Sequence, residues 1–137
     1  MWPVLAMAES SGADATEARH GHADALYSDG QYERALAEVT LVTRDDPQHP
    51  HAWFLRGLAE VRLERYEDAI DSFSHDIEAG SPGSATYLNR AWLYLRLGRL
   101  PEALDDTDTA EALSDEPSVP DAVARLRAHI ERLGPTR

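Results

Sequence analysis

The chain repeats itself with a step of 34 residues. Four sets of positions keep this step through three copies, two of them occupied by small residues and two by large ones. The sets are Ala23/Gly57/Ala91, Ala35/Ala69/Ala103, Tyr32/Tyr66/Leu100 and Leu36/Ile70/Leu104. A fixed period of this length indicates a repeat architecture, in which each unit packs on the next. The sequence therefore predicts three units without insertions, over residues 16–49, 50–83 and 84–117.

Each unit is expected to fold into two helices. In the first unit a helix over residues 15–28 is followed by Gly30, where a left-handed helix end favours glycine. The second helix has one apolar face, at Tyr32, Ala35, Leu36, Val39 and Val42. A seventh helix, capped by Ser118 and ended by Gly134, is expected within residues 118–137. Its apolar inner face and polar outer face suit the end of a solenoid.

The first fifteen residues fall outside the repeat and are predicted to form a flexible tail. They open with an apolar stretch, residues 1–8, which lacks a basic start and is interrupted by Pro3, so we do not expect a signal peptide. Either Met1 or Met7 could be the native start.

The pattern of large and small residues resembles that of the tetratricopeptide repeat family over about residues 16–117. The matching residues are Trp53 and Gly57, Tyr87, Ala91 and Tyr94, Ala69 and Phe73, and Ala35, Val39 and Pro47. The resemblance implies an all-α, right-handed solenoid of three helix-turn-helix units with a seventh, capping helix. Some positions depart from the family pattern: Glu60 replaces an aromatic residue, His22, Arg56 and Arg90 replace leucine, Asp76 replaces a small residue and Thr107 a large one.

The resemblance also implies that ligands lie in a concave groove lined by the first helix of each unit. On this basis the peptide-binding groove is expected to contain Tyr27, Phe54, Leu55, Leu58, Val61, Arg62, Leu88, Asn89, Trp92, Leu95 and Arg96. Large apolar residues on an exposed face usually mark a binding site. The alternative is that this stripe packs between neighbouring helices or under the seventh helix.

The charge of the chain is strongly negative, with 25 Asp and Glu against 13 basic residues and a net charge of -12. Such a surface repels nucleic acid and anionic membranes, and it favours partners with basic flanks unless it serves solubility alone. Only Asn89 fits the clamp with which some family members hold a terminal carboxylate. The expected partner is therefore an apolar peptide or amphipathic helix with basic flanks, met in the cytoplasm.

No pattern typical of an enzyme, a cofactor or a metal site stands out. His20 and His22 are two residues apart, and His49 and His51 flank Pro50 in a loop, so neither pair has the helical spacing of a metal site. We expect solvated histidines, and likewise solvated carboxylates at Asp105, Asp106 and Asp108.

Taken together, the sequence predicts a non-catalytic binding module, either an adaptor or a small chaperone. Secretion chaperones with three such repeats and an acidic surface are one similar group, although no motif singles them out. The alternative is a structural homo-oligomer, whose groove is filled by another copy or by the chain's own residues 1–8. The sequence leaves the partner, the pathway and the oligomeric state open.

Overall fold

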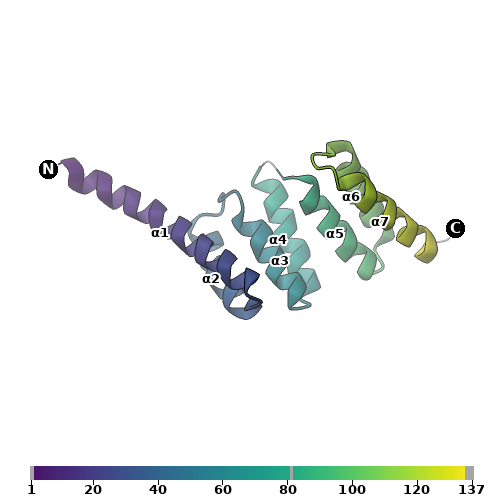
Figure 1. Ribbon diagram of the computed structural model, residues 1–137, viewed down its shortest axis with the longest axis horizontal. Coiled ribbons are helices and arrows are strands. Elements are labelled where there is room, and N and C mark those ends of the chain that lie inside the picture. Colours follow the sequence, from purple (N-terminus) through teal and green to yellow (C-terminus); the bar gives the residue numbers. More distant parts are fainter. Residues whose placement is uncertain (1, 81, 135–137) are drawn as a thin grey trace.

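The computed structural model describes residues 2–80 and 82–134, and every regular element in them is an α-helix (Figure 1). The helices are α1 (Trp2–Ser28), α2 (Tyr32–Asp45), α3 (Ala52–Arg62), α4 (Tyr66–Glu78), α5 (Ser84–Arg96), α6 (Leu100–Leu113) and α7 (Val119–Leu133). The all-α class predicted from the sequence is confirmed.

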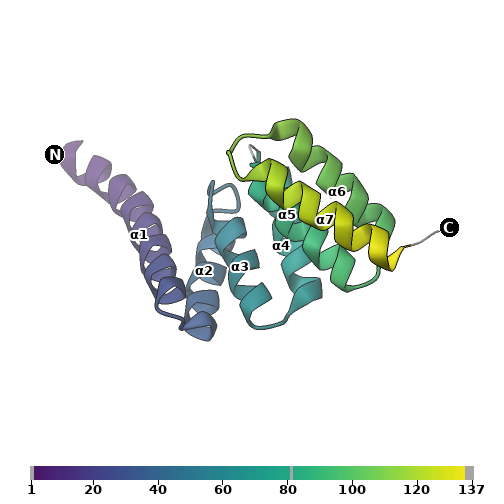
Figure 2. The ribbon, with the colours of Figure 1, turned by 45° about the vertical axis from the view of Figure 1, so that its right-hand side comes forward.

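The helices follow one another in space in the order of the sequence. α1 packs on α2, α3 on α4 and α5 on α6, and the second helix of each pair contacts the first helix of the next. α7 closes the row by packing on both α5 and α6 (Figures 1 and 2). This arrangement is a short solenoid, in which each unit buries its apolar face against its neighbours.

The turns between paired helices have the same geometry in all three units. Gly30, Glu64 and Gly98 all have left-handed backbones, with φ of 82°, 60° and 77°. The next residue in each turn donates its amide to a carbonyl near the end of the first helix, over 2.8 to 2.9 Å. These are Schellman helix ends, which glycine fits without steric cost. Gly30, predicted to end the first helix, thus has this role, Gly98 has it in the third unit, and Glu64 takes it in the middle unit.

Small residues allow paired helices to approach closely. Gly57 of α3 lies against the ring of Phe73 on α4, and a Cβ atom at residue 57 would come within 2.7 Å of that ring. Ala23, Ala69, Ala91 and Ala103 are completely buried. A larger side chain at such a position would force the helix axes apart, which explains why the repeat keeps these positions small.

Helix α1 differs from the sequence prediction because it begins at Trp2 rather than near residue 15. Residues 2–14 are helical where a flexible tail was expected. Pro3 lies in the first turn, where its missing N–H costs nothing, and alanine, leucine, methionine and glutamate favour helix in the residues that follow. The start of α1 points away from the other helices, so it does not cover α5 (Figures 1 and 2). Met1 lies outside the described residues.

No helix in residues 2–80 and 82–134 is both long enough and apolar enough to cross a membrane.

Candidate peptide-binding face

Trp92 is the exposed aromatic anchor on α5. Its side chain is 38% exposed, although it packs edge-on against Tyr66 of α4, with ring centroids 5.9 Å apart. The guanidinium of Arg96 lies over both rings, 5.1 Å from Tyr66 and 5.2 Å from Trp92. These contacts restrict the indole while leaving part of it accessible, as expected of a preorganised contact residue.

A hollow of about 380 Å³ lies beside Trp92, between α5 and α7. Its lining residues are Leu88, Asn89 and Trp92 of α5, and Ala122, Arg125, Leu126 and His129 of α7. Apolar walls with a few polar groups at the rim are typical of sites that receive an apolar side chain. The Asn89 amide already donates to the Ala85 carbonyl over 2.8 Å. The hollow can therefore accept an apolar group next to arginine and histidine side chains.

The stacking of arginine on tyrosine repeats along the solenoid. Arg62 lies over Tyr32 at 5.4 Å, as Arg96 lies over Tyr66, and both pairs keep the 34-residue step. Arg62 also lies over Tyr27 and donates a hydrogen bond to its hydroxyl. At the next step the corresponding residues are Leu100 and Ile130, which belong to the apolar cluster under α7. At the capping helix, an apolar contact thus takes the place of the arginine–tyrosine stacking seen between the units.

Other residues of the predicted groove contribute to the core. Leu55 and Leu95 are buried in clusters between helices, so the prediction that they face a ligand is wrong. Phe54, Leu58 and Val61 are partly buried against the cluster that contains Phe73 and Leu93. For this part of the stripe the alternative interpretation, packing between neighbouring units, describes what the structure shows. A three-unit solenoid uses much of its first-helix surface to hold the units together.

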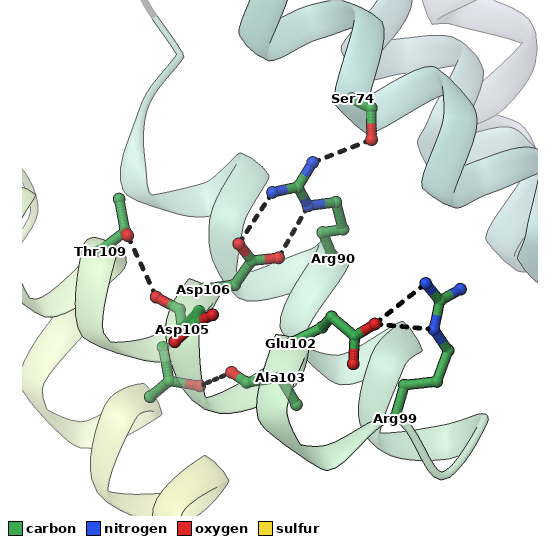
Figure 3. A network of polar contacts seen from close by, with 9 residues as sticks. Ser74, Arg90, Arg99, Glu102, Ala103, Asp105, Asp106 and Thr109 are labelled. Carbon is green, nitrogen blue, oxygen red and sulfur yellow. Dashed lines mark hydrogen bonds and ion pairs between the residues drawn. The ribbon is translucent and has the colours of Figure 1, made fainter.

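A buried polar pair joins the two helices of the third unit. Arg90 donates two hydrogen bonds to the Asp106 carboxylate, over 2.7 and 2.9 Å, and a third to Ser74 of α4 (Figure 3). Asp106 is buried, so its predicted solvation is wrong. Its hydrogen bonds raise the pKa of the Arg90 guanidinium, and Arg90 remains charged. Sequence spacing could not reveal this pair, because its partners lie on different helices.

The same two positions are paired in the first unit and are linked through Glu60 in the second. His22 lies 3.8 Å from Glu38 in the first unit. In the second unit, Arg56 contacts Glu60 on its own helix, and Ser72 of α4 donates to Glu60 over 2.5 Å. Departures from the family pattern at the leucine position are therefore compensated within each unit. Burial raises the pKa of Glu60, and it likewise raises the pKa of Asp76, whose carboxylate accepts a hydrogen bond from Thr86 of α5.

A second hollow, of about 520 Å³, lies between α2 and α4. Arg65 crosses it to contact Glu33 at 3.2 Å, and Asp68, Asp71 and His75 are among its other lining residues. Its charged lining makes it less suited to an apolar segment than the hollow at Trp92.

Two of the predicted solvated histidines are not solvated. His49, in the loop between α2 and α3, is only 5% exposed and lies 2.8 Å from the Glu17 carboxylate of α1. His20 of α1 packs on it, with ring centroids 4.6 Å apart. The i, i+3 spacing of Glu17 and His20 places both on one side of α1, and this is the signal that the sequence analysis missed.

The sequence of this chain matches one family model and several curated proteins. A tetratricopeptide repeat family model matches residues 20–85. Dynein axonemal assembly factor 4 of Rattus norvegicus is 30% identical over 89 residues, covering 65% of this chain and 21% of the relative. The Pan troglodytes protein is 28% identical over 127 residues, covering 93% of this chain and 29% of the relative. The chain thus spans less than a third of the length of these curated relatives.

Solved structures share the fold at low sequence identity. The type III secretion chaperone SycD of Yersinia enterocolitica, in complex with a peptide of the translocator YopD, has a TM-score of 0.77 and 21% identity, covering 88% of this chain and 92% of that one. The TPR domain of Arabidopsis OM64 has a TM-score of 0.77 and 22% identity. The match covers 86% of this chain and 98% of that one. PcrH of Pseudomonas aeruginosa, in complex with the chaperone binding region of PopD, has a TM-score of 0.76 and 22% identity. The match covers 88% of this chain and 91% of that one.

The 34-residue repeat, the paired helices and the matching family model all indicate tetratricopeptide repeats. The family model over residues 20–85 and the shared fold of the solved structures support assignment of the chain to the tetratricopeptide repeat family.

Proposed function

We propose that the chain is a non-catalytic protein-interaction module, an adaptor or a small chaperone, which holds an apolar segment or amphipathic helix of another polypeptide. The observation that carries the proposal is Trp92, exposed yet held by Tyr66 and Arg96 beside an apolar-walled hollow. A rigid aromatic residue next to a pocket is the usual centre of a binding surface.

Similar folds support a peptide as the partner. SycD was solved with a translocator peptide, and PcrH with the chaperone binding regions of PopD and of PopB. An amphipathic helix with apolar residues at i, i+3, i+4 and i+7 would lie across α5 and α7 and place an apolar side chain in the hollow between them. Leu88, Trp92 and Leu126 would contact its apolar face, while Tyr27, Arg62, Asn89 and Arg96 would line its path.

The flanks of the segment are proposed to be basic. The net charge of -12 attracts cations over the whole surface, even though Arg125 and His129 border the hollow itself. Basic residues would therefore lie beyond the hollow rather than inside it. The chain is proposed to bind this segment in the cytoplasm.

A peptide-binding measurement with matched variants tests the proposal. Peptides of about four helical turns, selected from a displayed library on the wild-type chain, serve as fluorescent probes. Trp92→Asp should weaken binding at least about tenfold, because it removes a central aromatic contact. Leu104→Asp is the control, since Leu104 of α6 is 41% exposed but does not line the hollow. Equal affinity of Trp92→Asp and wild type would contradict the proposed site.

The charge of the flanks is tested separately. Arginine flanks on the selected peptide should bind more tightly than glutamate flanks, and added salt should reduce the difference. Tighter binding of the glutamate version would overturn the proposal of basic flanks and leave the apolar contact standing.

The alternative, in which a second copy occupies the face, makes a different prediction. A homo-oligomer should lose mass in sedimentation when Trp92 is replaced by Asp, and it should bind the selected peptide only as it dissociates. A monomer at all concentrations would exclude this alternative.

A further inference from the structure

Three side chains capable of binding a metal converge where α1 meets the loop before α3. Glu17 and His20 lie one turn apart on α1, and His49 reaches them from the loop. One ligand atom from each residue lies within 4.8 Å of the other two. Side chains from two segments far apart in the sequence thus converge at the joint between the first and second units.

One atom of this cluster lacks a hydrogen-bond partner. The Nε2 atom of His20 is buried and contacts no donor or acceptor among the residues that the structure describes. Buried polar atoms are nearly always satisfied by protein, water or an ion, because an unsatisfied one costs free energy. Burial also lowers the pKa of His20, which favours the neutral imidazole. A neutral imidazole has a lone pair available for a metal ion.

The chemistry of the three ligands selects the kind of ion. We propose that Glu17, His20 and His49 bind a divalent transition-metal ion, of which Zn²⁺ is the best match. Two imidazoles and a carboxylate suit zinc and its neighbours, whereas calcium and magnesium prefer oxygen ligands alone. Three protein ligands leave a fourth position for water or for His51, whose ring centroid lies 6.4 Å from that of His20. The site goes beyond the peptide-binding role and lies in a different part of the fold.

Small movements bring the ligands into place. Around a tetrahedral zinc ion, ligand atoms lie about 3.4 Å apart, so the Glu17 and His20 side chains would have to bring their ligand atoms closer than the present limit of 4.8 Å. His49 Nε2 lies 2.8 Å from the Glu17 carboxylate, and the ion takes the place of the proton between them. The Nδ1 atom of His49 then carries the proton and gives up its long contact, 3.3 Å, with the amide of His51. The bound ion ties α1 to the loop before α3.

Zinc titration of the full chain tests the site. After treatment with a chelator and its removal, the wild-type chain should bind one Zn²⁺ ion in calorimetry, and its melting temperature should rise with zinc concentration. Co²⁺ in place of Zn²⁺ should give visible absorption bands that report the coordination geometry. His20→Gln should weaken binding at least about tenfold, because loss of even an outer partner of a metal ligand has an effect of that size.

His22→Gln is the matched control, since it makes the same change two residues away, at a position exposed to solvent. It should bind zinc as the wild type does. If His20→Gln fails to fold, Glu17→Gln replaces it, because Glu17 is exposed to solvent. The absence of saturable binding at one ion per chain would overturn the proposal. Zinc affinity equal to that of the wild type in His20→Gln, or in Glu17→Gln where it replaces His20→Gln, would overturn it too.

Discussion

Buried or half-buried charged residues occupy several of the positions at which this chain departs from the tetratricopeptide pattern. Arg90 replaces a leucine, and it is satisfied by Asp106 and Ser74. Arg56 and Glu60 of α3 form a similar cluster with Ser72. Once buried, such groups are stabilised mainly through their partners, because a charge left alone in the interior is costly.

Removal of one member of the Arg90–Asp106 pair should be strongly destabilising. We expect Arg90→Leu to lower the free energy of unfolding by about 3 kcal/mol, because Asp106 stays buried without its partner. The double variant Arg90→Leu/Asp106→Ala should lose less than this single variant, since it leaves no unpaired charge. Urea unfolding of both proteins gives the comparison, and a double variant less stable than Arg90→Leu would contradict this view of the pair.

Glu60 should make stability depend on pH in the direction opposite to most carboxylates. Its pKa is raised in the folded chain by burial, so the folded state holds a proton that the unfolded state releases. This stabilising contribution is complete below the ordinary glutamate pKa and is lost as the pH rises through the raised value. Glu60→Gln should therefore reduce the fall in stability between about pH 4.5 and neutrality.

Unfolding by urea at a series of pH values measures this effect. Glu67→Gln, an exposed carboxylate on α4, should leave the slope of stability against pH almost unchanged. If Glu60→Gln and Glu67→Gln changed the slope equally, the effect would come from overall charge and not from burial of Glu60.

At the scale of the elements, the periodicity of the sequence predicted the positions of most helices. The 34-residue step and the 3.6-residue stripe placed six helices near their observed positions, because each helix needs an apolar face toward its neighbours. The length of α1 was not predicted, because residues 2–14 belong to no repeat and only their helical propensity indicates a helix. The partners of Asp106 and His49 were also missed, because packing between helices sets them and local spacing does not.

The three turns between paired helices lead to a prediction about Glu64. This residue has a φ of 60°, whereas Gly30 and Gly98 occupy the same place in the other units. Glycine removes the steric cost of the left-handed backbone, and its greater freedom in the unfolded chain offsets part of the gain. We expect Glu64→Gly to raise the free energy of unfolding by roughly 0.5–1 kcal/mol.

The reverse change serves as the control. Gly98→Ala should lower stability by roughly 1–2 kcal/mol, because it places a Cβ atom on a left-handed backbone. Thermal and urea unfolding of both variants measure the effect. Loss of stability in Glu64→Gly would show that the Glu64 side chain makes a contribution that its backbone geometry does not reveal.

At the scale of the whole molecule, the shortness of the solenoid decides which surface remains accessible. Leu36 and Ile70 are buried, whereas Leu104 is exposed in the third copy of the same position. On the opposite side, α7 covers Leu95 but leaves Trp92 open. The stripe predicted from the sequence therefore divides into an accessible part at Trp92 and a buried part that includes Leu55 and Leu95. Sequence alone could not divide buried from accessible residues, because packing between neighbouring units and the position of α7 make that division.

Chemical-shift mapping of the labelled chain with the selected peptide tests the central claim most directly. We predict that the largest amide shifts fall on α5 and α7, in residues that line the hollow, together with a shift of the indole N–H of Trp92. Trp92→Asp should abolish these shifts, while Leu104→Asp should retain them. Shifts gathered instead on α2 and α4, around the charged hollow at Glu33 and Arg65, would contradict the assignment of the peptide-binding face.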